Sequence, residues 1–163
     1  MHHYDYVVVG AGSAGSALAN RLSESGKFTV CLLEAGGSDK KFWVQMPLGY
    51  GKVFHDPSVN WRYMTEPEPN LDNQSIYWPR GKVLGGSSSI NAMVWVRGHK
   101  RDYDEWNSVA PGWGWNNVQK IFNRIENWDG TSNISRGTNG PQPVHDVSSD
   151  VHPLTISYLE AAS

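Results

Sequence analysis

Two glycine-rich stretches hold the residues whose types and spacing suit chemistry, and that chemistry is the binding of a dinucleotide. The first runs from Gly10 to Gly15 and reads GAGSAG, which fits the pattern G-x-G-x-x-G. Gly10 permits a tight turn, Gly12 lets the backbone approach a pyrophosphate, and Gly15 lets the next helix pack closely. The pyrophosphate would meet the free N–H groups at the positive end of that helix.

An acidic residue lies at the distance that completes this pattern. Glu34 follows Gly15 by 19 residues, which places it at the tip of the next strand. A carboxylate there accepts hydrogen bonds from the ribose hydroxyls of adenosine and repels a 2′-phosphate, so NADP is disfavoured. A tight turn without a ligand is the alternative reading of the glycines, but it does not account for Glu34.

The second stretch, Pro79 to Gly98, reads PRGKVLGGSSSINAMVWVRG. Its glycines Gly81, Gly85 and Gly86 allow close approach of a ligand to the backbone. The three serines that follow supply hydroxyl groups and can cap a helix. From these residues alone, a cofactor cradle and a flexible Gly/Ser loop are both possible.

A strand, a helix and a second strand must position these residues. Apolar runs predict strands over Tyr4–Val9 and Phe28–Leu33, and Ser13–Ser23 has the pattern of a helix between them. Together they make one βαβ unit of an α/β fold. Residues 36–90 are rich in Gly, Pro, Asn and aromatic residues, which predicts a long irregular excursion.

The later part of the chain predicts mostly helices. We expect helices over residues 88–94 and 102–108 and a last helix from Pro153. Between them, Val118, Ile121, Phe122 and Ile125 predict an amphipathic helix that begins with a capping box of Asn116 and Gln119. A polar loop is expected over 128–143 and a short strand over 144–147. The last helix has no stop signal, and the sheet has only two good candidate strands. We therefore expect the fold to be incomplete without further sequence or a partner chain.

Composition excludes several classes of protein. The 163 residues are 39% apolar and 18% charged, with a net charge of −2, so a packed core is expected and a nucleic-acid-binding surface is not. The single cysteine, Cys31, excludes an internal disulfide, and we expect no metal site. No signal peptide or membrane-spanning run is visible, which predicts a cytoplasmic protein.

Five stretches resemble the N-terminal part of the glucose–methanol–choline (GMC) oxidoreductases, in particular choline dehydrogenases and bacterial long-chain alcohol dehydrogenases. They are VVVGAGSAGSALANRLSE, LLEAGG, NWRYMTEPEPN, PRGKVLGGSSSINAMVWVRGHKRDYDEW and GWGW. The resemblance implies a Rossmann-like FAD-binding domain with an irregular extension that covers the flavin. The cofactor-binding residues that it implies are Gly10, Gly12, Ser13, Ala14, Gly15, Glu34, Ala35, Trp61, Arg80, Gly81, Val83, Gly85, Gly86, Ser87, Asn91, Ala92, Met93 and Val94.

The same resemblance implies an activity and a division of the chain. Residues 1–98 would form the FAD-binding core and its extension, and residues 99–163 would begin the segment that leads to the substrate domain. The activity would be oxidation of a primary alcohol to an aldehyde, with hydride transfer to flavin N5 and reoxidation by a quinone-type acceptor or oxygen. Alternatives are a hydroxynitrile lyase on the same fold, an inactive cofactor-binding fragment, and a nicotinamide-dependent dehydrogenase.

Two departures from the family pattern carry further expectations. The family's catalytic pair, a His with a second His or Asn, lies far towards the C-terminus, and none of His2, His3, His55, His99, His145 and His152 falls in such a motif. We therefore expect no catalytic residue here and a second polypeptide that carries the C-terminal half. Choline oxidases of the family tether the flavin through a histidine before the motif asparagine. Ile90 stands there, which predicts non-covalent FAD.

Overall fold

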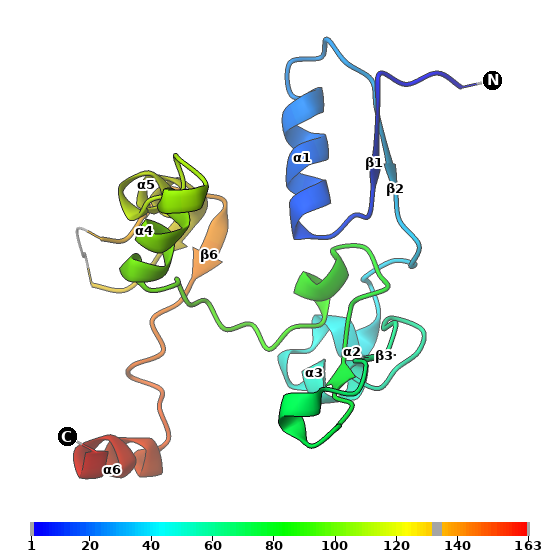
Figure 1. Ribbon diagram of the computed structural model, residues 1–163. Coiled ribbons are helices and arrows are strands. Elements are labelled where there is room, and N and C mark those ends of the chain that lie inside the picture. Colours follow the sequence, from blue (N-terminus) through cyan, green and yellow to red (C-terminus); the bar gives the residue numbers. More distant parts are fainter. Residues whose placement is uncertain (1, 132–134, 163) are drawn as a thin grey trace. The chain divides into compact units, whose positions relative to one another are not determined.

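The computed structural model describes residues 2–131 and 135–162, and the chain forms two compact units, Met1–Val94 and Trp95–Ser163 (Figure 1). Each unit is described by itself. The first unit holds the first glycine stretch and most of the second. The separate roles expected for residues 1–98 and 99–163 stay a prediction.

The expected βαβ unit opens the first unit (Figure 1). Strand β1 (Tyr6–Val9), helix α1 (Ser13–Ser23) and strand β2 (Val30–Leu33) follow one another, and the two strands pair in parallel with Val8 opposite Leu32. Both strands are shorter than the apolar runs predicted, and the βαβ prediction itself is confirmed.

Helix α1 packs tightly on β1. Val8 is buried, and a Cβ atom on Gly15 would overlap the carbonyl oxygen of Gly10 and come within 3.4 Å of Val8 Cγ1. Only a glycine lets the helix lie this close to the strand. Val7 and Val9, which alternate with Val8 along the strand, are 57% and 82% exposed.

The excursion over residues 36–90 contains only short elements. They are α2 (Phe42–Gln45), α3 (Tyr50–Val53), β3 (Tyr63–Met64), β4 (Tyr77–Trp78), and 3-10 turns at Pro47–Gly49, Pro69–Leu71 and Gly86–Ser89. Strands β3 and β4 pair antiparallel. An apolar core of Val53, Val59, Val83 and Ile90 holds the excursion together, so a run without regular periodicity still packs as a body.

The helix predicted over residues 88–94 is wrong. The chain instead makes the 3-10 turn Gly86–Ser89 and then runs without regular structure to His99. The Ser88 hydroxyl donates to the Gly85 carbonyl at 2.6 Å, and the Ser89 hydroxyl donates to the Leu84 carbonyl at 2.7 Å. Such local bonds from serine side chains to the backbone compete with a helix.

The second unit contains α4 (Lys100–Val109), α5 (Trp115–Ile125), β5 (Glu126–Trp128), β6 (Gln142–Val144) and α6 (Pro153–Ala162). The predicted helices correspond to α4, α5 and α6 and are confirmed. The capping box of Asn116 and Gln119 is wrong, because both residues lie inside α5. The start of α5 is held from α4 instead, where Asp104 Oδ1 accepts from the Trp115 N–H at 3.0 Å.

The loop predicted over residues 128–143 is confirmed for 129–131 and 135–141, and residues 132–134 lie outside the described residues, but the strand predicted over 144–147 is misplaced. Residues 126–128 and 142–144 form the parallel strands β5 and β6. Each strand has three residues, too few for an alternating pattern to be read from sequence. Contacts of Glu126, the first residue of β5, with residues distant in sequence hold this strand in place, and a local sequence pattern does not reveal such contacts.

Glu126 is a buried carboxylate in the second unit. It is fully buried, and it forms ion pairs with Arg97 and Arg136. It also accepts hydrogen bonds from Trp95 Nε1 at 3.1 Å and from the Gly137 N–H at 3.2 Å. Burial opposes its charge, but the Gly137 hydrogen bond and the two guanidinium groups outweigh burial and hold the pKa of Glu126 below its ordinary value.

Candidate functional site

The two glycine-rich stretches, far apart in sequence, meet in the first unit. The Gly85 N–H donates to the Ala11 carbonyl at 2.8 Å, and Gly12 and Gly85 form a parallel β-bridge. Gly86 has a φ of +58°, and a Cβ on it would lie 2.8 Å from the Gly12 Cα. The close approach of these glycines makes one backbone surface out of two separate motifs.

The start of α1 lies at this surface and is open. Gly12 is the N-cap residue, no side chain caps the helix, and no acidic residue lies in its first turn. Ser13 and Ala14 are exposed. The N–H groups of a first turn have no partner within their helix and carry the positive end of its dipole. This helix start therefore fits a negatively charged group such as a pyrophosphate.

Gly12 borders open space on the side where a side chain would project. The nearest atom to a Cβ built there is Gly86 Cα, at 3.9 Å. A ligand could thus approach the backbone of Gly12 to within contact distance, which is the role predicted for the second glycine of the pattern.

Glu34 links the first glycine loop to the loop that follows β2. Its Oε2 accepts from the Ala11 N–H at 2.8 Å, and its Oε1 accepts from the Gly36 N–H at 2.8 Å. A carboxylate has about four acceptor positions, so two remain for the hydroxyls of a ribose. Glu34, which is expected to bind adenosine, therefore also joins the two loops at Ala11 and Gly36. Ala35, the next residue, is exposed.

The second stretch crosses the carboxyl ends of β1 and β2. Gly37 and Val83 form a parallel bridge, and the Leu84 N–H donates to the Gly37 carbonyl at 2.9 Å. The Gly81 N–H donates to Ser87 Oγ at 3.1 Å. Ligands of open α/β sheets bind beyond the carboxyl ends of the strands, which is where these residues lie.

A buried asparagine that the sequence analysis did not single out organises the approach to this stretch. Asn60 is 2% exposed, and its Oδ1 accepts from the N–H groups of Arg62 and Arg80, at 2.9 and 3.0 Å. It thereby places Trp61 and Arg80, both named as site residues. Trp61 is 41% exposed, and Lys82 Nζ lies 4.5 Å from the centre of a Trp61 ring.

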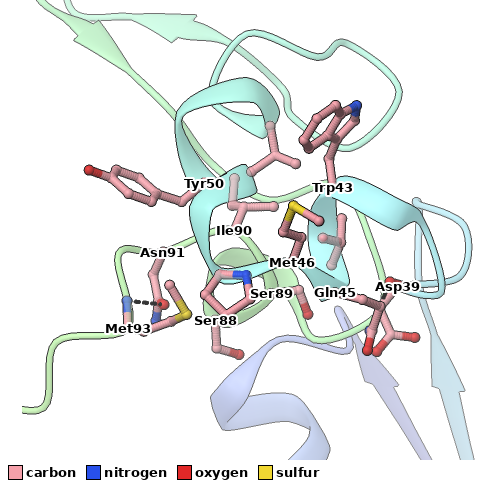
Figure 2. Close-up of a pocket in the computed structure, with 13 residues that line it drawn as sticks. Asp39, Trp43, Gln45, Met46, Tyr50, Ser88, Ser89, Ile90, Asn91 and Met93 are labelled. Carbon is pink, nitrogen blue, oxygen red and sulfur yellow. Dashed lines mark hydrogen bonds between the residues drawn. The ribbon is translucent and has the colours of Figure 1, made fainter.

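The end of the motif lies on the surface of the first unit. Asn91, Ala92, Met93 and Val94 are all exposed, and Met93 has a φ of +59°. Asn91 Oδ1 accepts from the Met93 N–H at 2.8 Å, which shapes this turn (Figure 2). Ile90, just before it, is buried in the apolar core. The Asn91 side chain is therefore open to solvent, whereas the Ile90 side chain is buried in the core.

A pocket of about 130 Å³ lies beside this turn (Figure 2). Residues from α2, α3 and the segment Ser88–Met93 line it. Within residues 2–131 and 135–162 no cluster of metal ligands and no membrane-spanning helix is found. Among the histidines, His99 is the N-cap residue of α4 and lies outside the first unit.

Comparison with known proteins gives one family. A sequence profile described as GMC oxidoreductase matches residues 4–163. An oxygen-dependent choline dehydrogenase of Vibrio vulnificus is 51% identical over 140 residues, which are 85% of this chain and 25% of that protein. An alcohol dehydrogenase (acceptor) of Pseudomonas putida is 45% identical over 160 residues, 97% of this chain and 29% of that one.

Solved structures of two oxidases have a similar fold. The crystal structure of a pyridoxine 4-oxidase from Mesorbium loti is similar with a TM-score of 0.89 at 35% identity, covering 98% of this chain and 31% of that one. A formate oxidase gives a TM-score of 0.84 at 27% identity, covering 98% and 30%. The chain therefore spans about a quarter to a third of the length of the proteins that it matches.

Proposed function

The chain belongs to the GMC oxidoreductase family, and we propose that it is the cofactor-binding part of an enzyme that oxidises a primary alcohol to an aldehyde. Its fold is the FAD-binding fold of that family, and its cofactor is FAD. The observation that carries the proposal is the continuous surface made by Gly12, Gly85 and Glu34 beyond the carboxyl ends of β1 and β2.

Each part of this surface has a task. The open start of α1, at Ser13 and Ala14, would hold the pyrophosphate by backbone N–H groups. Glu34 would accept hydrogen bonds from the adenosine ribose. The exposed turn at Asn91 to Val94 would contact the flavin ring. FAD, when bound, supplies a ring that accepts hydride from the alcohol carbon.

The proton of the alcohol hydroxyl needs a base, and the family resemblance implies that this base is a histidine in a C-terminal motif. The relatives named choline dehydrogenase and alcohol dehydrogenase are three to four times as long as the part that matches. We infer that the base comes from a polypeptide corresponding to their remaining length, either in the same chain or in a partner. The electron acceptor would be a quinone-type molecule or oxygen.

Ile90 favours FAD held without a covalent bond. Its side chain is hydrocarbon and 3% exposed, packed with Val53, Val59 and Val83. It offers no nucleophile to the flavin. The flavin would therefore be held by contacts and hydrogen bonds alone.

The proposal is tested by anaerobic addition of primary alcohols to the yellow holoprotein, isolated with whatever polypeptide accompanies it. We expect the flavin absorbance to bleach, and acid precipitation to release all of the flavin as FAD into the supernatant. A flavin that stays oxidised with every alcohol would favour a lyase or an inactive fragment. A nicotinamide dinucleotide in the supernatant would contradict the choice of cofactor.

Replacing Glu34 with glutamine should weaken FAD binding by about 10- to 100-fold, since one hydrogen bond to a charged group is worth roughly 1.5–3 kcal/mol. The amide group of the new side chain would turn an N–H donor towards the N–H of Ala11 or Gly36, which now meet carboxylate oxygens. The measurement is the Kd of FAD by recovery of flavin fluorescence.

The matched control for this prediction is Glu24→Gln. Glu24 is exposed and pairs with Arg21 at the far end of α1, so its loss should leave the Kd of FAD unchanged. Equal affinities for Glu34→Gln and the parent protein would show that Glu34 does not hold the adenosine.

A further inference from the structure

The last residues of the second glycine-rich stretch lie beyond the turn that would contact the flavin. After Asn91–Val94 the chain continues with Trp95, Val96 and Arg97. Val96 is 79% exposed, whereas Trp95 and Arg97 on either side of it are partly buried. In an extended chain every second side chain lies on the same side. Trp95 and Arg97 therefore lie together on the inner side of this segment.

The inner side of this segment is bound to Glu126, the buried carboxylate of the second unit. Trp95 Nε1 donates to Glu126 Oε1 at 3.1 Å, and the Arg97 guanidinium forms an ion pair with Glu126 Oε2. Arg97 also donates to Asn123 Oδ1 at 3.0 Å and to the Ser135 carbonyl at 2.6 Å. We call Trp95, Arg97 and Glu126 the carboxylate clamp, because they fasten the end of the stretch to α5 and β5.

The carboxylate clamp lies inside the second unit. Glu126 is fully buried, and its oxygens also accept from the Arg136 guanidinium and from the Gly137 N–H. The Arg97 side chain is 10% exposed. Hydrogen bonds between charged groups are strong and have defined directions. The backbone of the clamped segment is therefore held in one position on β5.

The turn that precedes the clamp needs support at both of its ends. Met93 has a φ of +59°, a left-handed conformation that is unfavourable for methionine and persists only where the surrounding structure holds it. Within the turn, Asn91 Oδ1 accepts from the Met93 N–H at 2.8 Å (Figure 2). Before the turn, Ile90 is buried in the apolar core, and after it, Trp95 is held by the clamp.

We propose that Glu126, acting through Trp95 and Arg97, is a positioning residue for the flavin, and this inference rests on the proposed function. The clamp fixes the C-terminal end of the turn and so narrows the conformations open to Asn91–Val94 before the ring binds. A narrower set of conformations lowers the entropy that ring binding must remove. The clamp acts on the ring side of the cofactor, so its loss should weaken the binding of FAD but not of ADP, which has no flavin ring.

Trp95→Phe tests the inference with a small change, because phenylalanine keeps an aromatic ring and removes the N–H that Glu126 accepts. The matched control is Trp128→Phe in the same unit, which removes an indole N–H that donates to the Thr131 carbonyl at 3.2 Å. Each holoprotein is isolated with whatever polypeptide accompanies it and is then stripped of flavin. The measurements are the Kd of FAD by recovery of flavin fluorescence, the Kd of ADP by calorimetry, and the visible circular dichroism of the rebound flavin.

We expect Trp95→Phe to weaken FAD binding by about 3- to 10-fold, the size of effect that passes through a chain of contacts. The same variant should change the circular dichroism of the flavin and leave the Kd of ADP within about twofold of the parent value. Trp128→Phe should alter neither affinity nor the flavin spectrum, even where it lowers the unfolding midpoint.

Glu126→Gln is the second variant, since a neutral amide cannot form the ion pairs with Arg97 and Arg136. In its folded form it should weaken FAD binding at least as much as Trp95→Phe does, again without an effect on ADP. Where Glu126→Gln does not fold, Trp95→Phe decides.

Three results would overturn the inference. They are a Trp95→Phe protein with the parent's FAD affinity and flavin spectrum, an equal weakening of FAD and ADP binding, and an equal weakening by Trp95→Phe and Trp128→Phe, which would assign the effect to the stability of the unit. None of these measurements uses an alcohol. Failure of every alcohol to bleach the flavin would therefore count against the proposed function alone.

Discussion

Replacing Gly12 with alanine should leave the fold intact and weaken FAD binding by about 100-fold or more, the loss of two hydrogen bonds to a charged group at roughly 1.5–3 kcal/mol each. The backbone of Gly12 has φ −74° and ψ −174°, which alanine adopts freely. The nearest atom to the new Cβ is Gly86 Cα at 3.9 Å. The methyl group would instead occupy the space through which a pyrophosphate reaches the backbone.

The measurements are the thermal unfolding midpoint of the apoprotein and the Kd of FAD by fluorescence recovery. Two matched variants separate folding from binding. Gly51→Ala also places its Cβ in open space, within helix α3, and should leave the Kd of FAD unchanged while raising the unfolding midpoint, because alanine favours a helix over glycine. Gly15→Ala should lower the unfolding midpoint, because its Cβ overlaps the Gly10 carbonyl oxygen. A Gly12→Ala protein with the parent's affinity for FAD would contradict the assignment of this loop.

Replacing Glu126 with alanine should destabilise the second unit by about 3–5 kcal/mol, the usual effect of removing one partner from a buried ion pair. Arg97 and Arg136 would lose their carboxylate, and Trp95 Nε1 and the Gly137 N–H would lose their acceptor. Urea denaturation followed by tryptophan fluorescence measures the free energy of unfolding. The exposed pair of Arg101 and Glu105 supplies the control, and Glu105→Ala should cost less than about 1 kcal/mol.

The same carboxylate makes stability depend on pH in a defined direction. Because the folded state holds the pKa of Glu126 below its ordinary value, its charge stabilises the folded state fully above about pH 4.5, the region of an unfolded glutamate. This contribution is lost as the pH falls from there through the folded pKa. The parent protein should therefore lose more stability between pH 6 and pH 3 than Glu126→Gln does. Parallel pH profiles would show that folding does not lower the pKa of Glu126.

The elements that were predicted well are those whose pattern is local. Ser13–Ser23 and the helix through Val118 and Ile125 repeat apolar or small residues over several turns, and packing follows that repeat. The helix predicted after Gly86 is absent because the Ser88 and Ser89 hydroxyls donate to nearby backbone carbonyls. The strands at Glu126 and Gln142 were missed because three residues cannot display a period.

The candidate site divides in the same way. The glycines and Glu34 could be named from sequence because their spacing reflects one βαβ unit. Asn60 could not, since its hydrogen bonds join Phe54, Arg62 and Arg80, and a lone asparagine in an aromatic-rich run carries no periodic signal. Glu126 was missed for the same reason. Its partner Arg97 lies 29 residues away.

The bridge that Glu34 makes between Ala11 and Gly36 bears on the kinetics of cofactor capture. The loops at the adenosine end are fastened together before any ligand arrives, so little conformational entropy remains to be lost there. The turn at Asn91 to Val94 is exposed along its whole length, and among the described residues no hydrogen bond joins it to the first loop. FAD would then bind first through its adenosine end, and the flavin ring would bind afterwards. The binding of the ring, which requires the turn to become ordered, would be the slower step.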